Sequence, residues 1–116
     1  MLVVEASPST RAVMERVLVS EYDVDTAATY EAARDRVADR AYDGVLLSVY
    51  HRSRDAAVRV GAALQAQKAG YVFGICGASL GAECSSLVEH GFDDVLQMPF
   101  TRDELLALLA RHLDAG

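Results

Sequence analysis

Short runs of apolar residues alternate along this chain with segments whose apolar residues recur at helical spacing. The strands that this pattern predicts lie at residues 2–4, 22–26, 45–47, 71–76 and 92–96, of which 22–26 alternates between apolar and polar residues and is expected nearer an edge of the sheet. Runs such as 2–4 and 45–47, which are apolar throughout, are typical of strands buried on both faces of a parallel sheet. Strands that alternate with helices form right-handed βαβ units, so this order predicts an α/β fold. We expect (βα)₅, a doubly wound five-stranded parallel sheet with strand order 2-1-3-4-5.

The predicted helices rest on capping residues and on apolar faces. Ser7 followed by Pro8 is a typical helix start, Thr29 is a second N-cap, and Thr101 with Glu104 forms a capping box. A helix is expected from about residue 55 to 68, and a weaker one at 79–90, where a glycine and two serines lower the helix propensity. The residues expected to face inward are Val13, Val17, Leu18, Ala32, Ala33, Val37, Ala38, Ala57, Val60, Leu64, Leu105, Leu106, Leu108 and Leu109.

Composition limits the class of protein. The 116 residues fit a single domain, 1–116, that is either complete or cut from a longer protein with an output domain. The net charge of −6 and the dispersed basic residues argue against a nucleic-acid-binding surface. With neither a signal peptide nor an apolar run of membrane-spanning length, the sequence predicts a cytoplasmic protein without membrane contact. Cys76 and Cys84 have no histidine at ligand spacing, which argues against zinc, and Cys76 is expected to be a small buried residue.

Doubly wound sheets bind ligands at the carboxyl ends of their strands. Those ends carry Glu5, Ala6, Ser48 and Cys76, and Met98 follows the fifth strand. One interpretation is a small-ligand-binding or hydrolytic protein on a flavodoxin-like fold that uses Ser48 or Cys76. A nucleophile needs a base within hydrogen-bond reach, and the only histidine expected near Ser48 is His51. No glycine-rich phosphate loop follows the first strand, so we favour a different interpretation.

Four segments resemble the receiver domain of response regulators in two-component signalling. They are Leu2–Glu5, similar to the first strand of that family, Tyr22–Ala27, similar to the second, Asp43–Leu47, similar to the phosphoacceptor strand, and Gly91–Leu96 with Met98-Pro99-Phe100, similar to its last strand and lysine-proline dipeptide. The resemblance covers nearly the whole chain and implies the same (βα)₅ fold. It also implies a cis peptide bond before Pro99. Phe92 stands where the family usually has a small residue, and we expect it to fill space beside the fourth helix.

At its functional positions the chain departs from this family. The resemblance places the two Mg²⁺-binding acids at Glu5 and Ala6, the phosphoacceptor aspartate at Ser48, the hydroxyl residue at Cys76, the lysine at Met98 and the switch aromatic residue at Val95. Only Glu5 keeps comparable chemistry. Mg²⁺ requires several oxygen ligands, and a methionine offers no cation to a phosphoryl group. The resemblance therefore implies a degenerate receiver, or pseudo-receiver, without metal, cofactor or enzymatic activity.

Two details of this pocket follow. Ser48 is either a small polar residue that fills the emptied pocket, which we favour, or a residue modified by a serine kinase. Glu5 is expected to pair with Arg52 or Arg54 in the nearby loop.

The resemblance further implies how such a domain signals. Receivers present the fourth helix, fifth strand and fifth helix to a partner, and phosphorylation shifts the population of two arrangements of that face. Without an acceptor, we expect a phosphorylation-independent module that binds a protein partner, or a second copy of itself, through one arrangement. The candidate face residues are Glu83, Ser86, Glu89, His90, Arg102, Asp103 and Leu106.

Overall fold

The computed structural model describes residues 1–67 and 69–113. Within them, five parallel strands form one sheet in the order β2-β1-β3-β4-β5, which confirms the predicted fold and strand order. The strands are β1 (Leu2–Val4), β2 (Asp25–Ala27), β3 (Gly44–Val49), β4 (Tyr71–Cys76) and β5 (Asp94–Gln97). The helices are α1 (Pro8–Leu18), α2 (Tyr30–Asp39), α3 (Arg54–Ala66), α4 (Glu83–Ser86) and α5 (Arg102–Leu113), with single 3₁₀ turns at η1 (His51–Ser53), η2 (Ala78–Leu80) and η3 (Leu87–His90).

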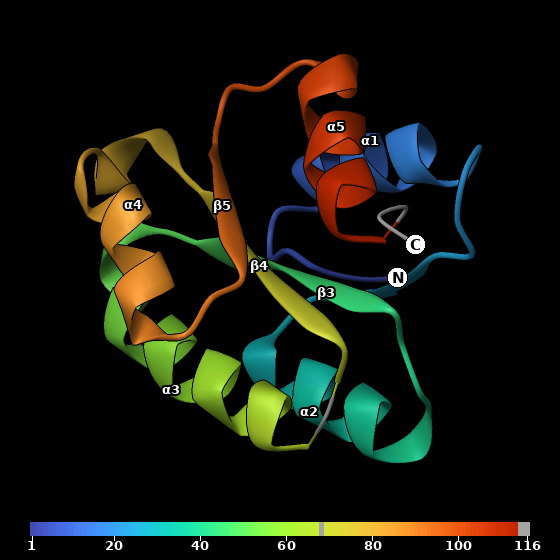
Figure 1. The fold of residues 1–116 in the computed structure, drawn as a ribbon, viewed down its shortest axis with the longest axis horizontal. Helices are drawn as coiled ribbons and strands as arrows, with labels where there is room; N and C mark the ends of the chain where they lie inside the picture. The colour runs from blue at the N-terminus through green and yellow to red at the C-terminus, as the bar shows by residue number, and fades with distance from the viewer. Residues whose placement is uncertain (68, 114–116) are drawn as a thin grey trace.

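Helices cover both faces of the sheet (Figure 1). Helices α1 and α5 lie on one face, and α2, α3 and α4 lie on the other. All six residues of β3 are buried. Val45 and Leu47 pack toward α2 and α3, whereas Leu46 packs toward α1 and α5. A central strand covered on both faces therefore appears in the sequence as an unbroken apolar run.

The predicted helix starts are confirmed. The Ser7 side chain caps α1, with Pro8 in the first turn, and the Thr29 hydroxyl accepts a hydrogen bond from the Ala32 N–H at 3.0 Å. Glu104 N–H donates to the Thr101 hydroxyl at 3.1 Å, and Thr101 N–H donates to the Glu104 carboxylate at 2.9 Å, which completes the capping box. Among the described residues, no helix combines the length and the apolar character that crossing a membrane requires.

Two predicted helix faces are partly wrong. Val13 is 52% exposed, and Met14 faces the core together with Leu18. Neighbouring positions on a helix are about 100° apart around its axis. The orientation of α1 about its axis therefore decides whether Val13 or Met14 faces the core. Ala38 is also exposed, whereas Ala33 is buried.

The predicted helix at 79–90 is wrong in extent, because only Glu83–Ser86 is α-helical. Gly81 has a φ of +56°, a backbone conformation that interrupts a right-handed helix before α4 begins. The 3₁₀ turns η2 and η3 flank this short helix. The segment after β4 is therefore a chain of short turns.

Cys76 and Cys84 form a disulfide that ties the end of β4 to α4, with their Cα atoms 5.8 Å apart. Cys76 is buried, as predicted. The pairing itself was not predicted, because a continuous helix from residue 79 would carry Cys84 away from the strand end. The turn at Gly81 instead brings the second cysteine back.

Phe92, expected to fill space beside the fourth helix, comes directly after η3, and its side chain packs against α3 and β4. The residue is 3% exposed. A Cβ at Gly61 would lie 2.9 Å from Cε1 of the Phe92 ring, and one at Gly74 would lie 3.1 Å from Cδ2. Two glycines, one on α3 and one on β4, thus leave the room that this phenylalanine occupies. The peptide bond between Met98 and Pro99 is cis, as the resemblance implies.

Candidate functional site at the carboxyl ends of β1 and β3

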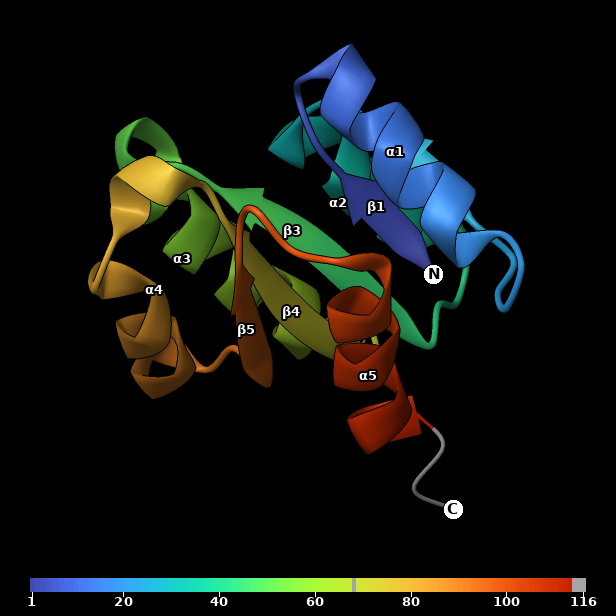
Figure 2. The same ribbon diagram turned by 90° about the horizontal axis from the view of Figure 1, so that it is seen from above.

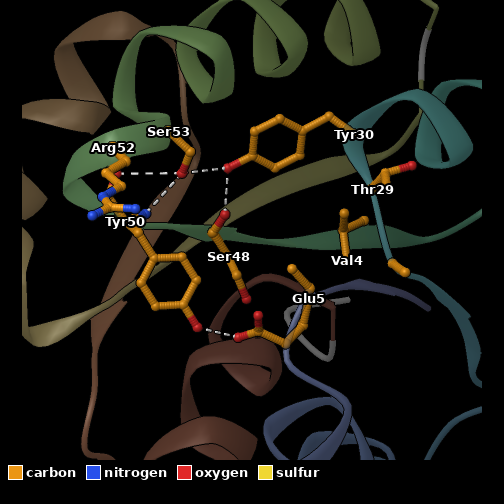
Figure 3. Close-up of a pocket in the computed structure, with 10 residues that line it drawn as sticks. Val4, Glu5, Thr29, Tyr30, Ser48, Tyr50, Arg52 and Ser53 are labelled. Atoms are coloured by element: carbon orange, nitrogen blue, oxygen red, sulfur yellow. Dashed lines mark hydrogen bonds between the residues drawn. The ribbon is translucent and has the colours of Figure 1, made fainter.

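The candidate site lies where β1 and β3, which pair side by side, come to their carboxyl ends. After β1 the chain turns to α1 on one face of the sheet, and after β3 it turns to α3 on the other face (Figure 2). Such a switch in direction leaves a crevice above the strand ends, which is the common ligand position in doubly wound sheets. Glu5 and Ser48 lie at this point, together with Tyr50 from the loop after β3 (Figure 3).

Glu5 is buried, with only 1% of its surface exposed. One carboxylate oxygen, Oε1, accepts a hydrogen bond from the Tyr50 hydroxyl. The other, Oε2, accepts from the Ser7 N–H at 3.0 Å, next to the start of α1. The expected ion pair of Glu5 with Arg52 or Arg54 is wrong. Arg54 instead lies against Asp55 and Glu83 on the far side of the loop, and Tyr50 supplies the donor.

Tyr50 is held in place from several sides. Its backbone N–H donates to the Ser53 hydroxyl at 3.0 Å. A Cβ at Gly77 would lie 2.3 Å from Cδ1 of the Tyr50 ring, so a glycine after β4 is what allows the ring to lie there. Burial raises the pKa of Tyr50, and the hydrogen bond to Glu5 raises it further. The Tyr50 hydroxyl therefore stays protonated and donates to the carboxylate at neutral pH.

Ser48 is 3% exposed, and its hydroxyl oxygen has no hydrogen-bond partner among the described residues. Its backbone carbonyl is occupied, because the Tyr30 hydroxyl donates to it at 2.7 Å. The same Tyr30 hydroxyl lies 3.0 Å from the Ser53 hydroxyl. Burial raises the pKa of Tyr30, against the opposite effect of the Ser53 hydrogen bond. Tyr30 thus links the start of α2 to the end of β3.

A cavity of about 450 Å³ opens between these groups. Its walls include Val4, Ala28, Tyr30 and Tyr50, and Glu5, Ala6 and Ser48 lie at the strand ends. The walls are mainly aliphatic and aromatic. The sequence indicated Glu5 and Ser48 but not Tyr30, Tyr50 or Gly77. A tyrosine two residues after the acceptor position was the available signal, although its contact with Glu5 spans 45 residues of sequence.

The other predicted pocket residues lie outside this cavity. Cys76 is bonded to Cys84 and has no free thiol. Met98 is half-buried against the core on the α1 and α5 side, and Val95 packs against the core on the α2 and α3 side. Within residues 1–67 and 69–113, no base lies within hydrogen-bond distance of the Ser48 hydroxyl. Neither Ser48 nor Cys76 therefore has the surroundings of an activated nucleophile.

The residues present do not fit a Mg²⁺ site. Glu5 offers one carboxylate, whose two oxygens already accept hydrogen bonds from Tyr50 and Ser7. Ala6 and Ser48 add a methyl group and a hydroxyl, whereas Mg²⁺ requires near-octahedral coordination, usually with one or two carboxylates and phosphates. In residues 1–67 and 69–113, no group of three or more histidine, cysteine, aspartate or glutamate side chains is placed to hold a metal ion.

The residues expected on the partner-binding face lie around β5. Strand β5 lies at the sheet edge, with α4 on one side and α5 on the other (Figure 2). Glu83 and His90 are exposed but turn toward Arg54, with contacts of 3.9 and 3.4 Å. Near α5, the Arg102 side chain donates to Ser20 at 3.4 Å. The remaining candidates are Glu89 and Asp103, both exposed, Ser86, which is half-buried, and Leu106, which is half-buried against the core.

Known receiver domains superpose on nearly the whole chain. The receiver domain of NtrX from Brucella abortus has a TM-score of 0.87 at 23% sequence identity, over 99% of this chain and 98% of that one. The receiver domain of a sensor histidine kinase from Pseudomonas aeruginosa, solved with a magnesium ion coordinated in its active site cleft, has a TM-score of 0.78 at 25% identity, over 98% and 96% of the two chains. The chemotaxis protein CheY4 from Vibrio cholerae has a TM-score of 0.81 at 24% identity, over 97% and 96%. No protein-family model and no curated protein matches the sequence. The chain therefore has the receiver-domain fold of two-component response regulators.

Proposed function

We propose that this chain is an atypical receiver domain that acts as a phosphorylation-independent signalling module and binds a protein partner. The observation that carries the proposal is Ser48. It occupies the place that the resemblance assigns to the phosphoacceptor, at the buried end of β3. A serine hydroxyl cannot form the acyl phosphate that a carboxylate forms. The chain keeps the scaffold of a receiver and replaces the group that would react.

The surroundings of Ser48 support the same conclusion. The Pseudomonas aeruginosa receiver domain binds magnesium in its cleft. Among the described residues, Glu5 is the one carboxylate at this site; it already accepts from the Tyr50 hydroxyl and the Ser7 N–H, and alone it supplies too few ligands for Mg²⁺. Met98 stands at the lysine position, so no ammonium group balances a phosphoryl charge there. Restoring phosphoryl chemistry would therefore require changes at several positions.

We propose the surface formed by α4, β5 and α5 as the partner-binding face. Two features hold this surface in one arrangement. The disulfide between Cys76 and Cys84 ties α4 to the end of β4, and the buried side chain of Phe92, which follows η3, packs against α3 and β4. A population shift needs two arrangements of comparable free energy. Because this face has one arrangement in the proposal, its signalling activity depends on how much of the partner is available.

An amide NMR titration tests the loss of phosphoryl chemistry. Mg²⁺ is added to the isotope-labelled domain, followed by beryllofluoride, a mimic of the phosphoryl group. We expect no saturable shift at Ser48, Cys76 and Met98. The matched variant Ala6→Asp/Ser48→Asp/Met98→Lys restores the acids and the cation, and it should respond under the same conditions. Saturable shifts in the native chain that spread to α4 would overturn the proposal.

Charge reversal tests the partner-binding face. Glu89→Lys and Arg102→Glu alter exposed side chains near η3 and at the start of α5. Arg34→Glu, on the exposed face of α2, is the control. Once a partner has been identified, its affinity should fall for the two face variants and stay unchanged for the control. Equal affinities for all three variants would place the binding surface elsewhere.

A further inference from the structure

We propose that the cavity above the ends of β1 and β3 binds a small, mainly apolar molecule that ends in a protonated amine. The inference concerns this cavity alone, and it holds whether or not α4, β5 and α5 bind a protein. It involves no covalent step. It rests on three observations: the shape and position of the cavity, the residues of its wall, and two buried polar groups at its base.

The position is favourable for a ligand. Three connections meet there: β1 to α1, β2 to α2, and β3 to α3. Doubly wound sheets bind their ligands at such a switch between β1 and β3. The volume of about 450 Å³ lies within the range of small-molecule sites. The space is therefore large enough for a molecule with one or two rings.

The wall suits an apolar body. Val4 and Ala28 contribute aliphatic surface. Tyr30 and Tyr50 contribute their rings (Figure 3). Both rings are anchored through their polar atoms, Tyr30 to the carbonyl of Ser48 and Tyr50 to the carboxylate of Glu5. Because these hydrogen bonds position the rings before a ligand arrives, little conformational entropy is lost on binding.

The base of the cavity holds a buried hydroxyl that needs a hydrogen-bond partner. The Ser48 hydroxyl is buried and has no hydrogen-bond partner in the part of the chain that the structure describes, and in Figure 3 it points to the side on which Glu5 lies. An unpaired buried hydroxyl is unfavourable, and native structures rarely keep one without a ligand or water. A group that reaches Ser48 and Glu5 together would satisfy it.

The charge at the base favours an ammonium group. Within the described part of the chain, the Glu5 carboxylate accepts only from a hydroxyl and a backbone N–H. Arg52 lines the same cavity, but no ion pair or hydrogen bond joins it or another basic side chain of the described residues to that carboxylate. The guanidinium of Arg11 reaches the backbone carbonyl of Glu5, at 2.9 Å, rather than the carboxylate. A buried carboxylate without a cation is stabilised by a ligand that brings one. An ammonium group carries three donors, enough for the Glu5 carboxylate and the Ser48 oxygen.

The test uses three indole probes that share one ring system and differ in charge. They are tryptamine, which carries an ammonium group, indole, which is neutral, and indole-3-acetate, which carries a carboxylate. Each is titrated into the native chain and followed by amide NMR. We expect saturable shifts with tryptamine at residues 5–6, 28–30 and 48–53, weaker binding of indole, and none of indole-3-acetate.

Variants then separate this site from unspecific binding. Glu5→Gln keeps the shape of the side chain and removes its charge, and it should weaken tryptamine about tenfold or more. Ala28→Trp places a bulky ring at an exposed position of the wall and should abolish binding without touching the core. Asp55→Asn, an exposed carboxylate outside the cavity, should bind tryptamine like the native chain.

The outcomes that overturn the proposal are equally specific. They are the absence of saturable shifts with tryptamine up to its solubility limit, equal affinity for tryptamine and indole-3-acetate, or unchanged tryptamine binding by Ala28→Trp. If Glu5→Gln does not fold, Ser48→Ala replaces it, with a smaller expected loss of affinity. A response to beryllofluoride would contradict the proposed signalling mode but would not affect these results, because that mimic carries no ring and no ammonium group.

Discussion

The hydroxyl of Tyr50 donates a hydrogen bond to the buried carboxylate of Glu5, and so joins the residue after β3 to the residue after β1. We predict that Tyr50→Phe lowers the free energy of unfolding by about 1–3 kcal/mol, because a buried acceptor then loses its donor. Urea unfolding measures the change. Tyr71→Phe is the control, since the Tyr71 ring is 38% exposed and its hydroxyl makes no hydrogen bond to the described residues. Equal losses for both variants would mean that the hydrogen bond contributes nothing.

Gly77 makes room for the Tyr50 ring, and a double-mutant cycle can show this. A Cβ at residue 77 would lie 2.3 Å from Cδ1 and 2.7 Å from Cε1 of the ring. We predict that Gly77→Ala costs about 1–3 kcal/mol of stability in the native background, through overpacking. In a Tyr50→Ala background the same change should cost much less, because the ring is gone. Additive effects of the two substitutions would contradict a clash between these residues.

We predict that Asp25 makes the free energy of unfolding depend on pH in the acid range. The Tyr42 hydroxyl donates to Asp25 Oδ2 at 2.6 Å and lowers the pKa of that carboxyl below 3.8, with help from Arg40. A carboxyl whose pKa is lower in the folded state stabilises the fold above its unfolded pKa. That contribution is lost as the pH falls through the lowered value. Tyr42→Phe should therefore raise the pKa of Asp25 and reduce the loss of stability below 3.8.

We predict that Tyr42 makes the free energy of unfolding depend on pH in the alkaline range. Burial and the hydrogen bond to Asp25 raise the pKa of Tyr42 from 10.0 to about 12. Its contribution to stability is present below 10.0 and is lost as the pH rises to about 12, and Tyr42→Phe removes it. NMR of the Asp25 carboxyl carbon and unfolding curves across pH test both predictions. An Asp25 titration that is the same in both chains would contradict them.

Reduction of the disulfide should destabilise the chain. The bond between Cys76 and Cys84 closes a loop with a sequence separation of 8. From the loss of chain entropy in the unfolded state, reduction is then expected to lower the free energy of unfolding by about 2–3 kcal/mol. Urea unfolding with and without dithiothreitol measures this loss. Cys84→Ser is the control, and its unfolding should not respond to dithiothreitol. If iodoacetamide labels the native, unreduced chain at these cysteines, the bond is absent and the prediction is wrong.

The strands and their order were predictable because a buried parallel strand leaves an apolar run in the sequence, as residues 45–47 do. The inward face of α1 was not predictable, because Val13 and Met14 are both apolar. Only the rotation of the helix about its axis decides which of the two faces the core. The short α4 depends on the positive φ of Gly81, which a glycine permits but does not require. Local patterns show neither the disulfide between Cys76 and Cys84 nor the hydrogen bond from Tyr50 to Glu5, because both depend on how the chain folds around them. The proposed roles of Ser48, Met98 and Val95 stay predictions.

The strand β5 that lies between α4 and α5 also has an unpaired outer edge. Exposed edges of this kind can recruit strands from other molecules and lead to aggregation. Here the edge is only four residues long, and it begins with Asp94, which lies 3.1 Å from His112 and 3.5 Å from Arg111. A short edge that starts with a charged cluster is a poor template for a second strand. The surface that we propose as the partner-binding face can therefore resist polymerisation at high protein concentration.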